Sequence, residues 1–140
     1  MDRDVFQDWL DRVGAAVMAG DYPTYAAAVC LPFTLITETT TTNVEDDETL
    51  HAGFAGYRQM LEDNGITHMV RLSSGVTPLG AGLIVGNYTT HLLANSRPVM
   101  QPFVSSMTLR QQDGVWRATS IVNSLSSMAW PEARSADNTR

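Results

Sequence analysis

The chain contains no lysine, so all nine of its basic side chains are arginines. Schiff-base chemistry through a lysine amine is therefore excluded, and arginine is too basic to accept a proton near neutral pH. The single cysteine, Cys30, excludes a disulfide within the chain and any cysteine-rich metal site. Because Cys30 lies between Val29 and Leu31, we expect a small buried hydrophobic residue there rather than a nucleophile.

Acidic residues are absent from the whole interval between Asn64 and Gln112. The arginines are scattered without a run and the formal net charge is −6, so no positive patch for nucleic acid is expected. No apolar run approaches the roughly 20 residues of a membrane span. The acidic, amphipathic N-terminus also has no apolar core of signal-peptide length. These absences predict a cytoplasmic protein that binds neither nucleic acid nor membrane.

The length of 140 residues and the apolar fraction of 44% are typical of one globular domain. We predict a single domain over residues 1–128 and a polar tail over residues 129–140, which is expected to be disordered from Pro131 onward.

Apolar residues recur at helical spacing in the first half of the chain. They predict an amphipathic helix over roughly residues 3–19, a short second helix from Asp21 to about Val29, and a third from Glu48 to Asn64. The other segments are typical of strands: Phe33–Thr39, the alternating run from Ile66 to Ser73, Leu83–Asn95, Met100–Gln111 and Val115–Ser126. The segment Ser74–Gly82 is predicted to be a loop, and Asp113-Gly114 a tight hairpin turn.

The strand Leu83–Asn95 holds apolar residues on both of its faces. An antiparallel strand that faces water usually shows one apolar and one polar face, so we expect both sides of this sheet to be covered. Helices cover one side of this α+β domain. A second copy of the chain is the simplest cover for the other side, which predicts a homodimer through the outer face of the sheet.

This order of elements resembles the nuclear transport factor 2-like superfamily, including its SnoaL-like and ketosteroid isomerase-like branches. The matching features are the amphipathic first helix, Gly20-Asp21-Tyr22 before the second helix, the long third helix, and a four-strand meander that closes with Asp113-Gly114-Val115-Trp116-Arg117. The resemblance covers about residues 4 to 126. It implies a cystatin-like cone in which three N-terminal helices and a curved, mainly antiparallel sheet enclose a conical pocket, and it implies dimers through the convex sheet. The matching motifs are architectural, so they point to a fold rather than to a reaction.

Three residues are candidates for catalysis. Glu38 falls close to the position of the catalytic base in the ketosteroid isomerases that the chain resembles, although the later strands supply no second acid and an exposed strand end is the alternative. His68, Val70 and Leu72 are alternate residues of one strand and therefore lie on the same face of it. Because Val70 and Leu72 are apolar, His68 is predicted to point into the helix-covered interior. Together with Tyr25 or Tyr22 it would resemble the dehydratase branch, in which an imidazole and a tyrosine-held water do acid–base work. A structural role is the alternative for His68.

Other side chains could contact a ligand on the wall of the cone. They carry hydroxyl, amide or imidazole groups: Tyr22, Tyr57, Tyr88, His91, Ser105 and Asn123. Aromatic residues that face a sheet also serve as ordinary core. If Tyr88 faces the pocket, His91 faces the dimer side unless a bulge intervenes.

Two kinds of site are not expected. An epoxide hydrolase site of two carboxylates bridged by an arginine is excluded, because Arg71 has no acid on the neighbouring strands. The three histidines have no close ligand spacing with a carboxylate, so neither a metal nor another cofactor is predicted.

Two functions remain as hypotheses. The first is a pocket for an apolar small molecule with a carbonyl or hydroxyl group, in which His68, Tyr25 and either Glu38 or Tyr88 converge; an isomerase, cyclase or dehydratase activity is then open. The second is a non-catalytic homodimeric module that binds a protein or senses a metabolite, with side chains filling the cone. A cavity of a few hundred cubic ångströms would distinguish the first from the second.

Overall fold

A computed structural model of the protein describes residues 1–124, so the tail predicted for residues 129–140 lies outside the described residues. The helices are α1 (Arg3–Ala19), α2 (Tyr22–Ala27) and α3 (Asp47–Asp63). The strands are β1 (Val29–Ile36), β2 (Thr41–Val44), β3 (His68–Gly80), β4 (Leu83–Ala94), β5 (Arg97–Pro98), β6 (Phe103–Gln112) and β7 (Val115–Asn123). The predicted α+β class is confirmed.

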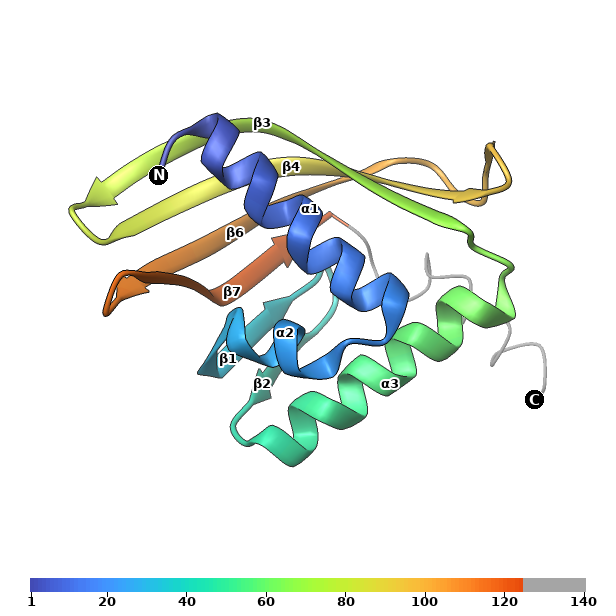
Figure 1. The fold of residues 1–140 in the computed structure, drawn as a ribbon, viewed down its shortest axis with the longest axis horizontal. Coiled ribbons are helices and arrows are strands. Elements are labelled where there is room, and N and C mark those ends of the chain that lie inside the picture. The colour runs from blue at the N-terminus through green and yellow to red at the C-terminus, as the bar shows by residue number, and fades with distance from the viewer. Residues whose placement is uncertain (125–140) are drawn as a thin grey trace.

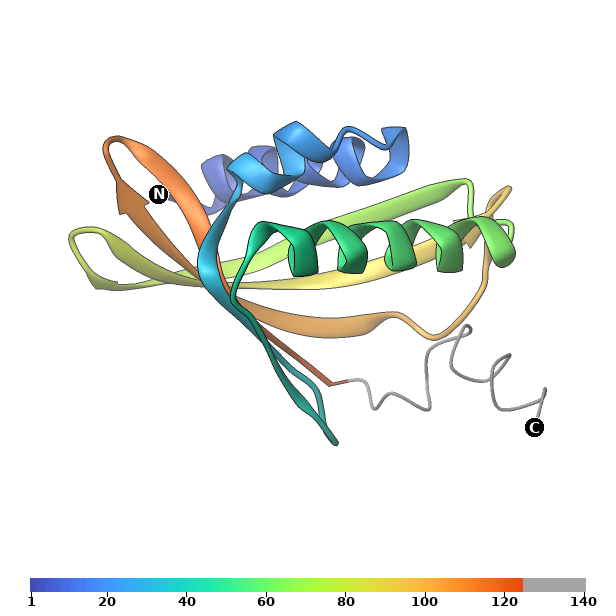
Figure 2. The ribbon, with the colours of Figure 1, turned by 90° about the horizontal axis from the view of Figure 1, so that it is seen from below.

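The strands form one sheet in the order β2-β1-β7-β6-β4-β3, and β5 pairs with β4 (Figure 1). All pairings are antiparallel except that of β1 with β7, which is parallel. The four-strand meander expected after Gly65 is therefore present as β3, β4, β6 and β7. All three helices lie on one side of this curved sheet (Figure 2).

Local side chains set the helix limits close to their predicted positions. The carboxylate of Asp2 accepts a hydrogen bond of 2.8 Å from the backbone N–H of Val5 at the start of α1. Asp46 accepts one of the same length from Thr49 at the start of α3. Gly20 ends α1 in the left-handed conformation, with φ of 76°, that favours glycine. Helix α2 is shorter than predicted, because Val29 already belongs to β1.

The hairpin predicted at Asp113-Gly114 is confirmed, since both residues have positive φ, 53° and 77°. The loop predicted for Ser74–Gly82 is wrong, because β3 continues to Gly80 and pairs with β4 as far as Leu83. Strand β3 is an edge strand, where proline is tolerated, and two register shifts accommodate the irregular sequence.

Two apolar clusters fill the space between the helices and the sheet. The first gathers around α1 and the middle of the sheet: Phe6, Trp9, Leu10, Val13, Ala28, Phe33, Ile84, Tyr88, Met107, Leu109 and Ala118. The second joins the end of α1 to α3 and the far ends of β4 and β6: Val17, Phe54, Met60, Leu61, Ile66, Leu92 and Phe103. Phe6 is fully buried, and its ring lies so close to Gly86 of β4 that a Cβ at that position would collide with it.

Candidate functional site

A row of polar residues crosses the helix-covered face of the sheet. Ser73 on β3 lies opposite Tyr88 on β4, Tyr88 lies opposite Ser105 on β6, and Ser105 lies opposite Asn123 on β7. Directly opposite residues of antiparallel strands point to the same face of a sheet. Ser73, Tyr88 and Ser105 are only 5%, 3% and 2% exposed, so this polar row is buried except at Asn123, which is half-buried.

Arg71 lies next to the polar row, opposite the buried Thr90. Its Nη2 donates a hydrogen bond of 2.8 Å to the carbonyl of Leu10 in α1, and its guanidinium carbon lies 5.6 Å from the centre of the Tyr88 ring. The guanidinium lies against Gly14 of α1, where a Cβ would make van der Waals contact with Nη2 at 3.4 Å. Among the described residues, the buried Nε of Arg71 has no hydrogen-bond partner, and neither does the buried Oγ of Ser73.

Two tyrosines reach this region from the helices. Tyr25 on α2 packs against both apolar clusters, and the hydroxyl of Tyr57 on α3 donates to the sulfur of Met69 at 3.6 Å. Burial raises the pKa of both phenols above the ordinary value, and the nearby charge of Arg71 offsets only part of that rise. Both tyrosines are therefore neutral at physiological pH and offer hydroxyl groups.

The polar row and Arg71 occupy the boundary between the two apolar clusters. Along β4, Ile84 and Tyr88 belong to the first cluster and Leu92 to the second, and the buried Thr90 lies between them. Along β6, Ser105 separates Phe103 from Met107 in the same way. The interior thus has an apolar region on each side of a polar band.

The interior brings together five of the predicted site residues: Tyr25, Tyr57, Tyr88, Ser105 and Asn123. The interior position of Arg71 was not predicted, because the sequence offers this arginine no acidic partner on the neighbouring strands. Arg71 alternates with Met69 and Ser73 along β3, so the three share one face of the strand. This pattern places Arg71 in the interior only when it is known which face of β3 points toward the helices.

The predicted inward position of His68 is wrong. His68 is exposed and lies opposite Leu93, while Met69, Arg71 and Ser73 take the helix side of β3. The error arose because Val70 and Leu72, which share the parity of His68, are 38% and 50% exposed on the outer face. On this strand the face that carries the apolar residues Val70 and Leu72 points away from the helices.

His91 and Glu38 also lie apart from the interior cluster. His91 lies opposite Val70 on the outer face, as expected if Tyr88 faces inward. Glu38 was predicted within a strand, but β1 ends at Ile36 and Glu38 is exposed in the turn before β2. The backbone N–H of Thr37 closes this turn by donating to the carbonyl of Thr40 at 2.9 Å.

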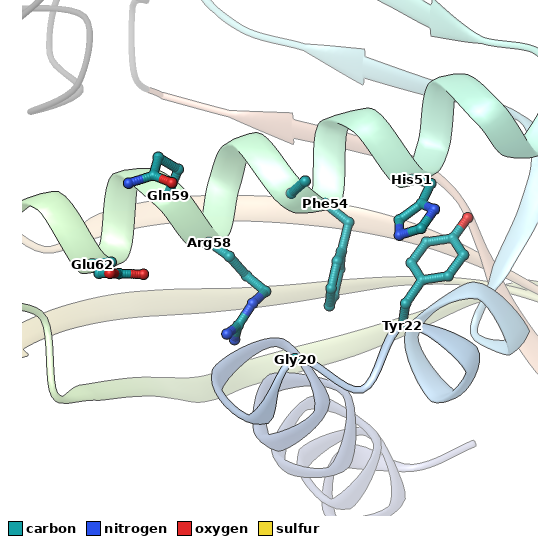
Figure 3. A pocket seen from close by; sticks show the side chains of 8 residues that line it. Gly20, Tyr22, His51, Phe54, Arg58, Gln59 and Glu62 are labelled. Atoms are coloured by element: carbon teal, nitrogen blue, oxygen red, sulfur yellow. The ribbon is translucent and has the colours of Figure 1, made fainter.

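Tyr22 lies in a groove of about 320 Å³ on the outside of the helices (Figure 3). Its ring stacks on His51 with centroids 4.1 Å apart, and its hydroxyl donates to a carboxylate oxygen of Asp47 at 2.7 Å. Arg58 in the same groove donates to the carbonyls of Val17 and Met18, so it holds the end of α1. A second groove, of about 410 Å³, is lined by Arg12, Pro23, Thr24, Ala27, Ala28, Val115 and Trp116. Neither groove is lined by the polar row or by Arg71.

The environment of Tyr22 gives a test of this geometry. Burial, the hydrogen bond to Asp47 and the charge of that carboxylate raise the pKa of Tyr22 from 10.0 to about 12. A raised pKa in the folded state contributes stability that is present below pH 10 and is lost as the pH rises through about 12. We expect Asp47→Asn to lower the pKa of Tyr22, measured by phenolate absorbance at 295 nm with Tyr22→Phe to assign the signal. Asp46→Asn is the matched control, and equal shifts in both variants would contradict the assignment.

The three helices, the curved sheet and its parallel β1–β7 pair define a domain with the nuclear transport factor 2-like fold. Among solved structures, the chain is similar to a protein of unknown function with this fold from Shewanella oneidensis MR-1, with 15% identity, 87% of this chain and 98% of that chain covered, and a TM-score of 0.69. It is also similar to a domain of unknown function with a cystatin-like fold from Nostoc punctiforme PCC 73102, with 12% identity, 99% and 84% covered, and a TM-score of 0.63. A third similar structure is a protein from Streptomyces avermitilis provisionally named a dehydratase from the nuclear transport factor 2-like family, with 14% identity, 88% and 96% covered, and a TM-score of 0.62.

These similarities confirm the predicted resemblance at the level of the fold. No model of a known protein family matches the sequence, and no curated protein matches it. Within residues 1–124, no group of three or more histidine, cysteine, aspartate or glutamate side chains is placed to hold a metal ion. The helices of the same range include none long and apolar enough to cross a membrane.

Proposed function

We propose that this protein is a small-molecule-binding domain whose ligand lies between the helices and the sheet, against the polar row and Arg71. The observation that carries the proposal is the buried polar band between two apolar clusters. Ligand sites are mostly apolar and contain a few placed polar groups, and this interior has that composition. Buried polar atoms without partners, such as the Arg71 Nε and the Ser73 Oγ, are costly unless something else binds them.

We propose binding without catalysis by the described residues. An acid–base reaction needs a group that can exchange a proton near neutral pH within hydrogen-bond reach of the ligand. The interior groups are hydroxyls, an amide and a guanidinium, whereas His68, His91 and Glu38 lie outside this cluster. This arrangement favours a carrier or sensor over an isomerase or a dehydratase.

The proposal includes a homodimer through the outer face of the sheet. Four apolar residues, which we call the outer patch, are exposed there: Val70 at 38%, Leu72 at 50%, Val104 at 54% and Val122 at 43%. The acid-free interval supplies β3, β4 and β6, so two copies can meet there without burying a carboxylate from these strands. The cytoplasmic location stays a prediction from the sequence.

A second candidate is a homodimeric interaction module that binds no ligand. It is favoured by the positions of the two grooves, which lie outside the interior, and by the apolar clusters that fill the cone.

The adjacent residues Ser105 and Ser106 separate these two candidates, because they lie on opposite faces of β6. Ser105 belongs to the buried polar row, whereas Ser106 donates to the amide oxygen of Asn87 at 2.6 Å on the outer face. We expect a screen of ring-containing fragments, followed by amide chemical shifts in NMR, to give shifts centred on Ser73, Tyr88 and Ser105. Ser105→Val should weaken binding at least tenfold, and Ser106→Val should leave it within twofold. Shifts confined to the grooves, or no shifts, would favour the interaction module.

A further inference from the structure

We infer that the interior ligand carries a carboxylate and that Arg71 binds it. This inference rests on the proposed function, because it names the chemical class of the molecule that the interior would hold. It starts from the charge of the interior rather than from its shape.

Arg71 brings a permanent positive charge into the interior without a matching negative one. Within residues 1–124 its guanidinium donates to the Leu10 carbonyl, lies over the face of the Tyr88 ring and approaches Gly14, and it also acts electrostatically on Tyr25 and Tyr57; none of these partners is a carboxylate. The neighbouring strand β4, like β3 itself, comes from the acid-free interval between Asn64 and Gln112 and supplies no partner acid. The acidic residues on either side of Leu10 in α1, Asp8 and Asp11, are exposed. A guanidinium that is partly removed from water and unpaired is unfavourable, and a bound anion would relieve that cost.

The surrounding structure holds Arg71 in a fixed place. Gln7 of α1 bonds to the backbone of β3 directly after the arginine side chain: its Nε2 donates to the carbonyl of Arg71 at 2.6 Å, and its Oε1 accepts from the N–H of Ser73 at 2.7 Å. A binding group on a strand that is fixed in this way loses little freedom when the ligand binds.

The remaining donors suit a carboxylate. The Nε of Arg71 and the Oγ of Ser73 are both buried and unpartnered among the described residues, and they stand two positions apart on the same face of β3. Arginine presents a planar set of donors that matches a carboxylate, and the hydroxyl of Tyr25 adds a neutral donor in the same region. The apolar side chains on both sides of these donors fill the cone, so the aliphatic or aromatic body of such an acid would lie among them only after they move apart.

A purely structural role, in which Arg71 only ties β3 to α1, predicts different results. If the arginine is structural, Arg71→Met lowers the melting temperature by removing the bond to Leu10. If the arginine is kept for a ligand, Arg71→Met leaves the melting temperature of the free protein unchanged or raises it, because a poorly compensated charge is replaced by an apolar side chain of similar length.

The test compares acids with their uncharged amides. Hexanoate, decanoate, 4-phenylbutyrate and 2-naphthoate, each beside the corresponding amide, are titrated into the unaltered protein by isothermal calorimetry. We expect at least one acid to bind tenfold or more tightly than its amide. Arg71→Met should reduce that preference to within twofold, Arg71→Lys should retain part of it, and Arg58→Gln, which alters the arginine of the outer groove, should retain all of it.

The outcomes separate this inference from the proposed function. Equal binding of acids and amides, or an unchanged preference in Arg71→Met, would overturn the carboxylate inference and leave the proposed interior ligand site standing. Failure of both series to bind would overturn the inference together with the pocket. The comparison in the unaltered protein needs no variant, so a poorly folded Arg71→Met would not prevent a decision, and Arg71→Gln repeats the loss of charge.

Discussion

Val104→Glu is expected to convert a dimer of this protein into a monomer. Val104 is the most exposed residue of the outer patch, at 54%, and it lies opposite Thr89 near one end of the β4–β6 pairing. A dimer through this face would bury one new carboxylate from each copy without a partner. Such burial costs about 3 kcal/mol or more, which weakens the dissociation constant by roughly a hundredfold. Sedimentation equilibrium over a range of protein concentrations measures the change.

Val5→Glu is the matched control for this experiment. Val5 is also an exposed valine, at 47%, but it lies in the first turn of α1 on the helix side of the sheet, where an acidic residue is well tolerated. We expect Val5→Glu to remain dimeric. A monomeric unaltered protein, or equal dissociation of both variants, would show that the outer patch is not the interface.

The helices and the hairpin could be predicted because local residues determine them. Asp2 and Asp46 cap helices at predicted positions, Gly20 ends α1, and Asp113-Gly114 forms the tight turn. These features depend on side chains within a few residues of each other, so a single sequence contains the necessary information.

The interior cluster could be predicted only in part. Tyr57 follows from the apolar stripe of α3, and Tyr88 follows from the alternation along β4. The facing of β3 did not follow, because its outward residues Val70 and Leu72 are apolar and its inward residue Arg71 is charged. Cross-strand register decides that facing, and register depends on contacts between residues far apart in the chain.

The missed arginine and the misplaced histidine are therefore one error with one cause. A shift of one residue in the register of β3 exchanges His68 and Arg71 between the two faces of the sheet. The exchange changes the expected chemistry of the interior from a proton-transferring imidazole to an anion-binding guanidinium. Here the facing of one strand decides between a catalytic hypothesis and a binding hypothesis.

Phe6→Ala is expected to lower the free energy of unfolding by about 3–5 kcal/mol, the usual cost of removing a large buried aromatic side chain. Phe6 is 0% exposed, and its ring lies 6.5 Å from that of Trp9 and 6.1 Å from that of Tyr88, so its loss opens a cavity above the middle of β4. Urea unfolding at a fixed protein concentration, followed by circular dichroism, gives the free energy.

Gly86 makes the result specific to this contact. Gly86→Ala alone should cost about 1–3 kcal/mol, because the new methyl group collides with the ring of Phe6. In the double variant the methyl group enters the space that Phe6 vacated. The loss of unfolding free energy in the double variant should therefore be smaller than the sum of the two single losses by about 1 kcal/mol or more. Gly53→Ala on α3 is the control: nothing lies within 4 Å of a Cβ there, and alanine should stabilise the helix by roughly 0.5–1 kcal/mol in either background. Strict additivity of Phe6→Ala and Gly86→Ala would mean that the ring of Phe6 does not rest on β4, and the packing of α1 that also positions Arg71 beneath Gly14 would then be wrong.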